Sequence, residues 1–415
     1  FGTIDTTNAN SGQIVVSGGV TLDTNTQTTV DFALSDLADA NGAAAFGTGQ
    51  KIYIIKDYQH LTGTAADHFV FDGTDQTDFR QTVQQHGDDV AELAYNSGAF
   101  GADESGIFAE WDLSQINLLS QQSGGYVIST SDPDVITATI TGSGDVTYAD
   151  GNITIASNGT NDYWGRTFVI GAALNLAKDE ALGNTSLLDI TSGSVAVNAT
   201  KQTIGSLQTS VAGAITMATG GRLELAGDSS VSGANSGIAS GSTIALATGS
   251  ETLTINHVES LGQADISLGD GTTLLLSGIA SGSDAAVFDN AVSGASGTVA
   301  LDSGAQVEFT SMDNGFGRLH VYGTGTTAIV NNMQGDDTAL GNAHVDVDSG
   351  SRVELAGTSS WTLDNALDIA AGGTLAVTAG GSSNVFSFGN TTYQNVSGNV
   401  SLTNALLYIG GDVNG

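Results

Sequence analysis

The sequence predicts an all-β fold, a parallel β-helix whose short strands pair with the turns before and after them. Three observations predict it: short apolar runs alternate with polar residues, the runs end at Gly, Asn, Asp or Ser, and 57 glycines accompany one proline. Alternation is typical of strands, and the closing residues are typical of turns. A hydrophobic content of 40% is too high for a disordered chain.

The clearest unit of this pattern lies in residues 171–207. Three alternating apolar runs occur there, at Leu174–Leu176, Leu187–Ile190 and Val195–Val197, with no helical pattern between them. Three strands in about 25 residues correspond to one turn of a three-sided coil. Similar paired anchors recur towards the C-terminus, so the sequence predicts a single body over residues 1–415.

The alternation also predicts which side chains face the core. Leu225, Leu276 and Leu355 occupy apolar anchor positions, so we expect them to be fully buried. Glu224 and Glu354 stand between apolar neighbours in Leu-Glu-Leu and Val-Glu-Leu. These glutamates should therefore point outward from strands whose flanking residues point inward.

The same unit resembles a known repeat. ALNLAKDEALGNTSLLDITSGSVAVNATKQTIGSL, at residues 173–207, is similar to the passenger-associated repeat of AIDA-type, self-associating autotransporter adhesins of bacteria. That repeat reads G-x-L-x-L, ALG-N-T, G-x-V-x-L and QTIGSL. Elsewhere the pattern shortens to its strand core, as in GGRLELAG at 220–227.

The resemblance implies a right-handed parallel β-helix, exported as the passenger of an autotransporter. It places the protein on the outer face of a Gram-negative outer membrane or in the medium. A signal peptide is then expected before Phe1, and a membrane-embedded translocator barrel after Gly415.

The resemblance also implies adhesion, with no catalytic role and no cofactor. Expected partners are a host extracellular-matrix protein such as fibronectin, or glycans such as glycosaminoglycans. One alternative is self-association that drives bacterial aggregation and biofilm formation. An alternative of another class is a β-helical polysaccharide lyase or hydrolase.

Charge and composition exclude several partners. The chain carries 44 acidic and nine basic residues, a formal net charge of −35. Nucleic acids and anionic membrane surfaces require clustered Lys and Arg, so neither is expected as a partner. The same charge opposes weak side-by-side self-association at low salt. No cysteine is present to form disulfides or thiolate metal sites, and no apolar stretch is long enough for a membrane helix.

Residues 51–125 differ in composition from the rest of the chain, which predicts a loop-rich insertion. Aromatic residues and histidines gather there. Between Asp78 and Tyr95, apolar residues at helical intervals and a capping box at Asp89 and Glu92 predict a short helix that starts near Val90. Insertions in repeat proteins commonly emerge on the binding face.

The insertion and the rungs that follow it predict a ligand-binding groove. Aromatic rings would stack on sugars or anchor a peptide, and aligned cations would meet sulfates or carboxylates. The candidate residues are Tyr58, Tyr95, Trp111, Arg166, Lys178, Lys201 and Arg222. The competing interpretation is that the aromatic residues form core and that the cations neutralise neighbouring acids.

Three other patterns resemble reactive or metal sites, but each is explained better as a turn. His86-Gly87-Asp88-Asp89 carries adjacent carboxylates without the other residues of a pectin hydrolase. Gly227-Asp228-Ser229-Ser230 lacks the final glycine of a serine-protease motif. Asp132-Pro133-Asp134 offers oxygen ligands for calcium, yet matches no known calcium loop. We expect no catalytic residues and no metal site.

Overall fold

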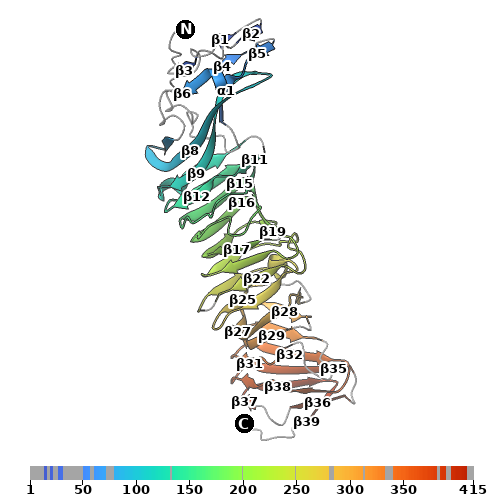
Figure 1. The fold of residues 1–415 in the computed structure, drawn as a ribbon. Helices are drawn as coiled ribbons and strands as arrows, with labels where there is room; N and C mark the ends of the chain where they lie inside the picture. Colours follow the sequence, from blue (N-terminus) through green and yellow to red (C-terminus); the bar gives the residue numbers. More distant parts are fainter. Residues whose placement is uncertain are drawn as a thin grey trace. The chain divides into compact units, whose positions relative to one another are not determined.

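The computed structural model describes residues 14–15, 19–21, 27–30, 50–56, 60–71, 79–130, 133–198, 200–247, 249–279, 285–311, 314–331, 340–380, 384–388 and 394–408. The chain forms two compact units, residues 1–186 (unit 1) and 187–415 (unit 2). Both carry turns of a parallel β-solenoid, about 12 turns in all over the described residues. The predicted parallel β-helix is confirmed (Figure 1).

Unit 1 begins with a mostly antiparallel sheet. Its order is β1-β4-β9-β8-β7, with β12 added parallel to β9. The described strands of the unit are β1 (Ile14–Val15), β2 (Gly19–Thr21), β3 (Thr28–Val30), β4 (Gln50–Lys56), β5 (His60–Thr62), β6 (Phe69–Phe71), β7 (Phe79–Gln85), β8 (Asp88–Asp103), β9 (Gly106–Leu118), β10 (Tyr126–Ser129), β11 (Asp134–Ile136), β12 (Thr139–Gly142), β13 (Val146–Asp150), β14 (Asn152–Ile155) and β15 (Arg166–Leu176).

The predicted helix near Val90 is wrong, because that segment is part of strand β8. β7 and β8 form an antiparallel hairpin whose turn residues, His86 and Gly87, have φ of 54° and 91°. Two consecutive positive φ values suit a two-residue hairpin turn, so the turn selects strands. Across the hairpin, Arg80 forms an ion pair with Glu92, the residue expected to complete the capping box.

The described part of residues 51–125 is therefore mainly sheet and not the loop-rich insertion that its composition predicts. Its short helices are α1 (Ala65–His68) and the 3-10 turn η3 (Gln122–Gly124). None of the described helices has the length and apolar character needed to cross a membrane.

The coil of unit 1 is built from parallel pairs. β10 pairs with β13, which pairs with β15, and β11 pairs with β14, which also pairs with β15. Its interior holds three fully buried tyrosines, Tyr126, Tyr148 and Tyr163. The Tyr163 hydroxyl lies 2.8 Å from Thr167 Oγ1, which gives this buried hydroxyl a hydrogen-bond partner.

Unit 2 continues the same pattern with strands of successive turns lying side by side (Figure 1). Its described strands are β16 (Leu187–Val197), β17 (Lys201–Ile204), β18 (Ser206–Thr209), β19 (Ile215–Met217), β20 (Arg222–Leu225), β21 (Ser229–Val231), β22 (Thr243–Leu246), β23 (Thr252–Ile255), β24 (Asp265–Leu268), β25 (Thr273–Ser277), β26 (Ala286–Phe288), β27 (Val292–Asp302), β28 (Gln306–Phe309), β29 (Gly315–Val321), β30 (Thr327–Val330), β31 (His344–Val347), β32 (Arg352–Gly357), β33 (Trp361–Leu363), β34 (Leu367–Ile369), β35 (Thr374–Ala379), β36 (Asn384–Phe388), β37 (Gln394–Val396), β38 (Asn399–Thr403) and β39 (Ala405–Tyr408). A 3-10 turn, η4, covers Val258–Leu261.

The core of unit 2 consists of aliphatic stacks that run from turn to turn. Leu276 pairs in register with Ile255 on one side and Leu301 on the other, and all three are 0% exposed. Leu225 and Leu355, at 0% and 1%, are buried in the same way. The predicted inward positions are confirmed.

Buried asparagines close some corners of the coil. In unit 2, the Asn235 amide donates to Ser260 O at 2.8 Å and accepts from Ile215 N at 3.1 Å. Asn161 does the same in unit 1, between Ala181 O and Ile140 N. Each side chain thus satisfies main-chain groups that would be buried without a partner where the chain turns.

Candidate functional site

The predicted ligand-stacking aromatic residues of the N-terminal sheet lie in its core. Tyr95 in β8 and Trp111 in β9 are 1% and 0% exposed, and the Trp111 ring packs 5.4 Å from that of Phe71. Burial raises the pKa of Tyr95 to about 12. The prediction that these two rings stack on a ligand is wrong, because neither ring face reaches solvent. Tyr58 lies outside the described residues.

Arg166, at the start of β15, is held by a buried carboxylate. Asp145 is 0% exposed, and its Oδ2 accepts from Arg166 Nε at 3.0 Å and from Nη2 at 2.6 Å. Its Oδ1 accepts from the Arg166 main-chain N at 2.7 Å. The guanidinium also lies 5.1 Å above the Phe168 ring. Arg166 is therefore fixed in place, and its charge is balanced.

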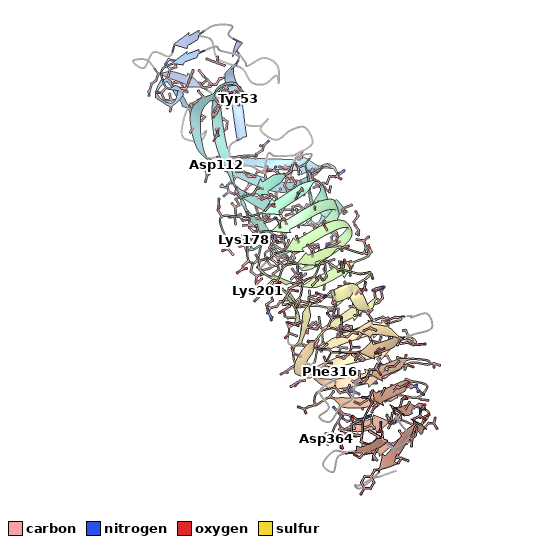
Figure 2. All side chains as sticks on the ribbon, turned by 90° about the vertical axis from the view of Figure 1, so that its right-hand side faces the viewer. Tyr53, Asp112, Lys178, Lys201, Phe316 and Asp364 are labelled. Atoms are coloured by element: carbon pink, nitrogen blue, oxygen red, sulfur yellow. The ribbon has the colours of Figure 1, made fainter. Side chains whose placement is uncertain are left out.

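The other predicted cations also have protein partners. Lys178 Nζ donates to Ser157 O at 3.0 Å and to Gly159 O, at the surface of unit 1 (Figure 2). In unit 2, Lys201 and Arg222 are register partners on β17 and β20. Both form ion pairs with Glu224, at 2.7 and 2.8 Å. The contacts favour the competing interpretation, in which these cations neutralise neighbouring acids.

The pairing of arginines extends along the whole chain. Each of its five arginines contacts a carboxylate: Arg80 with Glu92, Arg166 with Asp145, Arg222 with Glu224, Arg318 with Asp346, and Arg352 with Glu354. In a protein of net charge −35, these cations serve as counter-ions for the protein's own acids. The outward placement of Glu224 and Glu354 is confirmed, since both are partly exposed between buried neighbours.

We expect the acid dependence of stability to reveal the Glu224 cluster. Bonds from Lys201, and then from Arg222, hold the pKa of Glu224 below its ordinary value. A lowered folded-state pKa means that the stabilisation is complete above the unfolded-state pKa and is lost as the pH falls through the folded one. Glu224→Gln should cost about 0.5 to 1 kcal/mol at neutral pH, as exposed ion pairs do. The difference from the wild type should shrink as the pH falls below the ordinary glutamate pKa of about 4.3, and it should disappear below the lowered pKa of Glu224.

Urea denaturation across this pH range checks the prediction. Glu104→Gln is the matched control, because Glu104 is exposed in the tight turn between β8 and β9. It should change the free energy of unfolding by less than about 0.5 kcal/mol. A Glu224→Gln deficit that persists unchanged at low pH would contradict the assigned ion pairs.

The structure reveals an exposed row that the sequence prediction missed, apart from Arg166. From 161 to 170 the chain alternates without a break between buried and more exposed side chains. The inward set includes Tyr163, Thr167 and Val169, each 0% exposed. The outward set, which we name the outward row, is Asp162, Trp164, Arg166, Phe168 and Ile170. The sequence carries no clear signal for it, because both sets of alternate positions in NDYWGRTFVI mix polar and apolar residues.

Two members of the outward row are large exposed apolar side chains. Trp164 is 57% exposed and Ile170 is 46% exposed. Phe168, between them, is half-buried and lies beside Thr147 of the adjacent turn. An indole and an aliphatic side chain so open to water, in line on one face, are typical of a contact surface.

The backbone of the outward row packs closely against the preceding turn of the coil. A Cβ built on Gly165, between Trp164 and Arg166, would lie 1.9 Å from the carbonyl oxygen of Gly144. Only glycine fits there, so the backbone beneath the row is pressed against the preceding turn. Trp164 N donates to Gly142 O at 3.2 Å in the same contact. The main chain of the row is thus hydrogen-bonded to the preceding turn.

The motifs that resemble catalytic sites have structural roles. His86 and Gly87 form the β7–β8 turn, and Gln84 donates to Asp89 at 2.6 Å beside it. Ser229 Oγ accepts from Leu207 N and donates to Gly227 O, each at 3.0 Å. Within the described part of the chain, no three or more acidic or histidine side chains gather in a way that could hold a metal ion.

Comparison with known proteins gives one distant relative. The chain is 31% identical over 152 residues to the uncharacterized lipoprotein YdeK of Escherichia coli strain K12. The match spans 33% of this chain and 11% of that much longer protein. No protein-family model matches the chain, and no solved structure matches it.

Proposed function

We propose that this chain is the exported, adhesive part of a bacterial surface protein, and that it binds a host glycan or matrix protein through its outward row. The exposure of Trp164 beside the anchored Arg166 carries the proposal. Tryptophan and arginine are the side chains that most often dominate binding energy at protein interfaces. Arg166 begins strand β15, and Trp164 lies two residues before it with its main-chain N bonded to Gly142 O, which limits the entropy lost on binding.

The solenoid architecture supports this proposal. Strands paired with those of the adjacent turns present a continuous exposed face, on which an extended ligand can make many modest contacts. The resemblance of residues 173–207 to the repeat of autotransporter passengers supports the same role. The similar protein from E. coli is named a lipoprotein, which favours a location in the cell envelope or on the cell surface.

A glycosaminoglycan held by aligned cations receives less support. Such a site needs cations whose charge is available to bind sulfate groups. The five arginines are already bonded to carboxylates of the protein. Among the predicted binding residues, Arg166 remains in the row, but Asp145 balances its charge. Trp164 replaces the buried Tyr95 and Trp111 as the proposed stacking side chain.

Trp164→Ala should abolish most of the adhesive binding while leaving the fold intact. Loss of a central exposed indole costs an interface about 2 kcal/mol or more, which weakens binding roughly thirtyfold. Surface plasmon resonance of the wild type and the variant against arrayed glycans, fibronectin, collagen and laminin would measure the effect. The melting temperature should not change, because the side chain is 57% exposed.

Tyr408→Ala is the matched control, since Tyr408 is an aromatic residue of unit 2 that is 63% exposed. It should bind as the wild type does. If Trp164→Ala also binds as the wild type does, the row is not the adhesive site. Release of reducing ends or unsaturated sugars from a bound polysaccharide would instead indicate a lyase or hydrolase.

A further inference from the structure

We propose that the outward row binds an uncharged polysaccharide, and not a sulfated or carboxylated one. This inference rests on the proposed adhesive function and names the chemical class of its ligand. Three features of the row carry it: an open stacking surface, a cation already neutralised from below, and carboxylates at both ends.

The stacking surface suits the face of a sugar ring. One face of many pyranose rings carries only C–H groups, and it packs on an aromatic ring as other apolar groups do. Trp164 offers such a ring at 57% exposure, and Ile170 extends the apolar surface at the far end. Phe168 already has the guanidinium of Arg166 over its ring, 5.1 Å from the centroid. Trp164 is therefore the open platform.

The charge of the row disfavours an anionic ligand. Asp145 is fully buried beneath Arg166 and bonds both Nε and Nη2, so the row has no net positive charge there. Asp162 is the outward position before Trp164, two residues earlier in the chain, and is exposed. At the other end, exposed Asp150 places its Oδ1 3.2 Å from the Cβ position of Gly171, which follows Ile170. A polyanion would meet two carboxylates on a protein of net charge −35.

The same carboxylates suit a ligand rich in hydroxyl groups. An ionised carboxylate only accepts hydrogen bonds, and sugar hydroxyls are donors that form charge-assisted bonds with it. Within the described part of the chain, the hydrogen bonds of Arg166 use its main-chain N, Nε and Nη2, which leaves Nη1 to donate to a sugar oxygen. The row thus offers acceptors at its ends and a donor near its centre.

The length of the row favours a polymer over a single sugar. Outward positions of an extended chain are about 6.6 Å apart, so Trp164 to Ile170 covers on the order of 20 Å. That length spans several sugar rings in line. Asp162 and Asp150 would then contact different rings of one chain, and their modest bonds would add.

The test is isothermal titration of the full chain with two sets of ligands. The neutral set is maltohexaose, cellohexaose, mannohexaose and N-acetylchitohexaose; the anionic set is heparin and hyaluronan fragments. We expect at least one neutral oligosaccharide to bind, with an affinity that changes less than about twofold between about 0.05 M and 0.5 M NaCl. Heparin should bind at least about tenfold more weakly.

Variants separate the contributions of stacking and charge. Trp164→Ala should weaken the neutral ligand by about tenfold or more, while Tyr408→Ala leaves it unchanged. Asp162→Asn should weaken the neutral ligand a few-fold, because an amide accepts less strongly than a carboxylate. The same change should strengthen any residual heparin binding, because it removes a repelling charge.

Other outcomes overturn the inference in distinguishable ways. Tight heparin binding that falls steeply with salt and depends on Trp164 would contradict a neutral ligand but keep the adhesive row. Binding of matrix protein alone, sensitive to Trp164→Ala, would do the same. If neither glycans nor matrix proteins bind the chain, the proposed adhesive function itself fails.

Discussion

Leu276→Asp should abolish the cooperative unfolding of unit 2. Leu276 is 0% exposed and stacks between Ile255 and Leu301 of the adjacent turns, which are also 0% exposed. A carboxylate there is buried without a partner, which costs more than about 4 kcal/mol. In a solenoid, each turn is stabilised mainly by its neighbours, so one such defect separates the turns on either side of it. The urea transition monitored by circular dichroism should broaden or split.

Leu275→Asp is a matched control in the same strand. Leu275 is the next residue of β25 and is partly exposed, whereas both of its neighbours are buried. The new carboxylate would reach water, so the variant should unfold cooperatively, with a loss below about 1 kcal/mol. Similar unfolding of the two variants would contradict the alternation that defines the coil.

Among substitutions of residues that hold the outward row in place, Asp145→Ala should cause the largest loss in the free energy of unfolding. The Asp145 carboxylate is 0% exposed and accepts three hydrogen bonds from Arg166, one from the main chain and two from the guanidinium. Removal of one partner of a charged, partly buried pair leaves the other without compensation. Because Arg166 is 45% exposed, water recovers part of the loss, and we expect a cost of about 2 to 3 kcal/mol.

Differential scanning calorimetry would measure the destabilisation caused by Asp145→Ala. Asp162→Ala removes the same charge from an exposed position of the row and should cost less than about 0.5 kcal/mol. Asp145→Ala should also weaken ligand binding, since Arg166 and its contact with Phe168 lose their anchor. Equal melting temperatures for the two variants would show that Asp145 is not the anchor.

The fold was predictable because alternation and turn residues act locally. Leu225, Leu276 and Leu355 are buried as expected, since in a solenoid a residue's neighbours in the adjacent turns repeat its own pattern. Residues 79–103 were not predictable from the same rule. Val83, Val90 and Leu93 fit a helix as well as a strand. The positive φ values of His86 and Gly87 favour the hairpin. The spacing of apolar residues carries no information about these φ values.

The candidate site was harder to predict because it depends on register. Tyr163 and Trp164 are adjacent large aromatic residues, and the sequence alone allows either one to face the core. The structure buries Tyr163, whose hydroxyl bonds Thr167, and so turns Trp164 outward. The sequence identifies the cations but not the acids with which they pair. Arg166 contacts Asp145 only because the two residues lie on adjacent turns of the coil.

Quenching of tryptophan fluorescence tests the central claim, that a ligand lies on Trp164, most directly. The chain has three tryptophans, of which Trp111 and Trp361 are 0% and 5% exposed and Trp164 is 57% exposed. Acrylamide should therefore quench Trp164 almost alone, and Trp164→Phe should remove most of the quenching. Saturation with the tightest-binding neutral oligosaccharide should lower the wild-type quenching to the level of Trp164→Phe. Saturable binding that leaves the quenching of Trp164 unchanged would contradict the account.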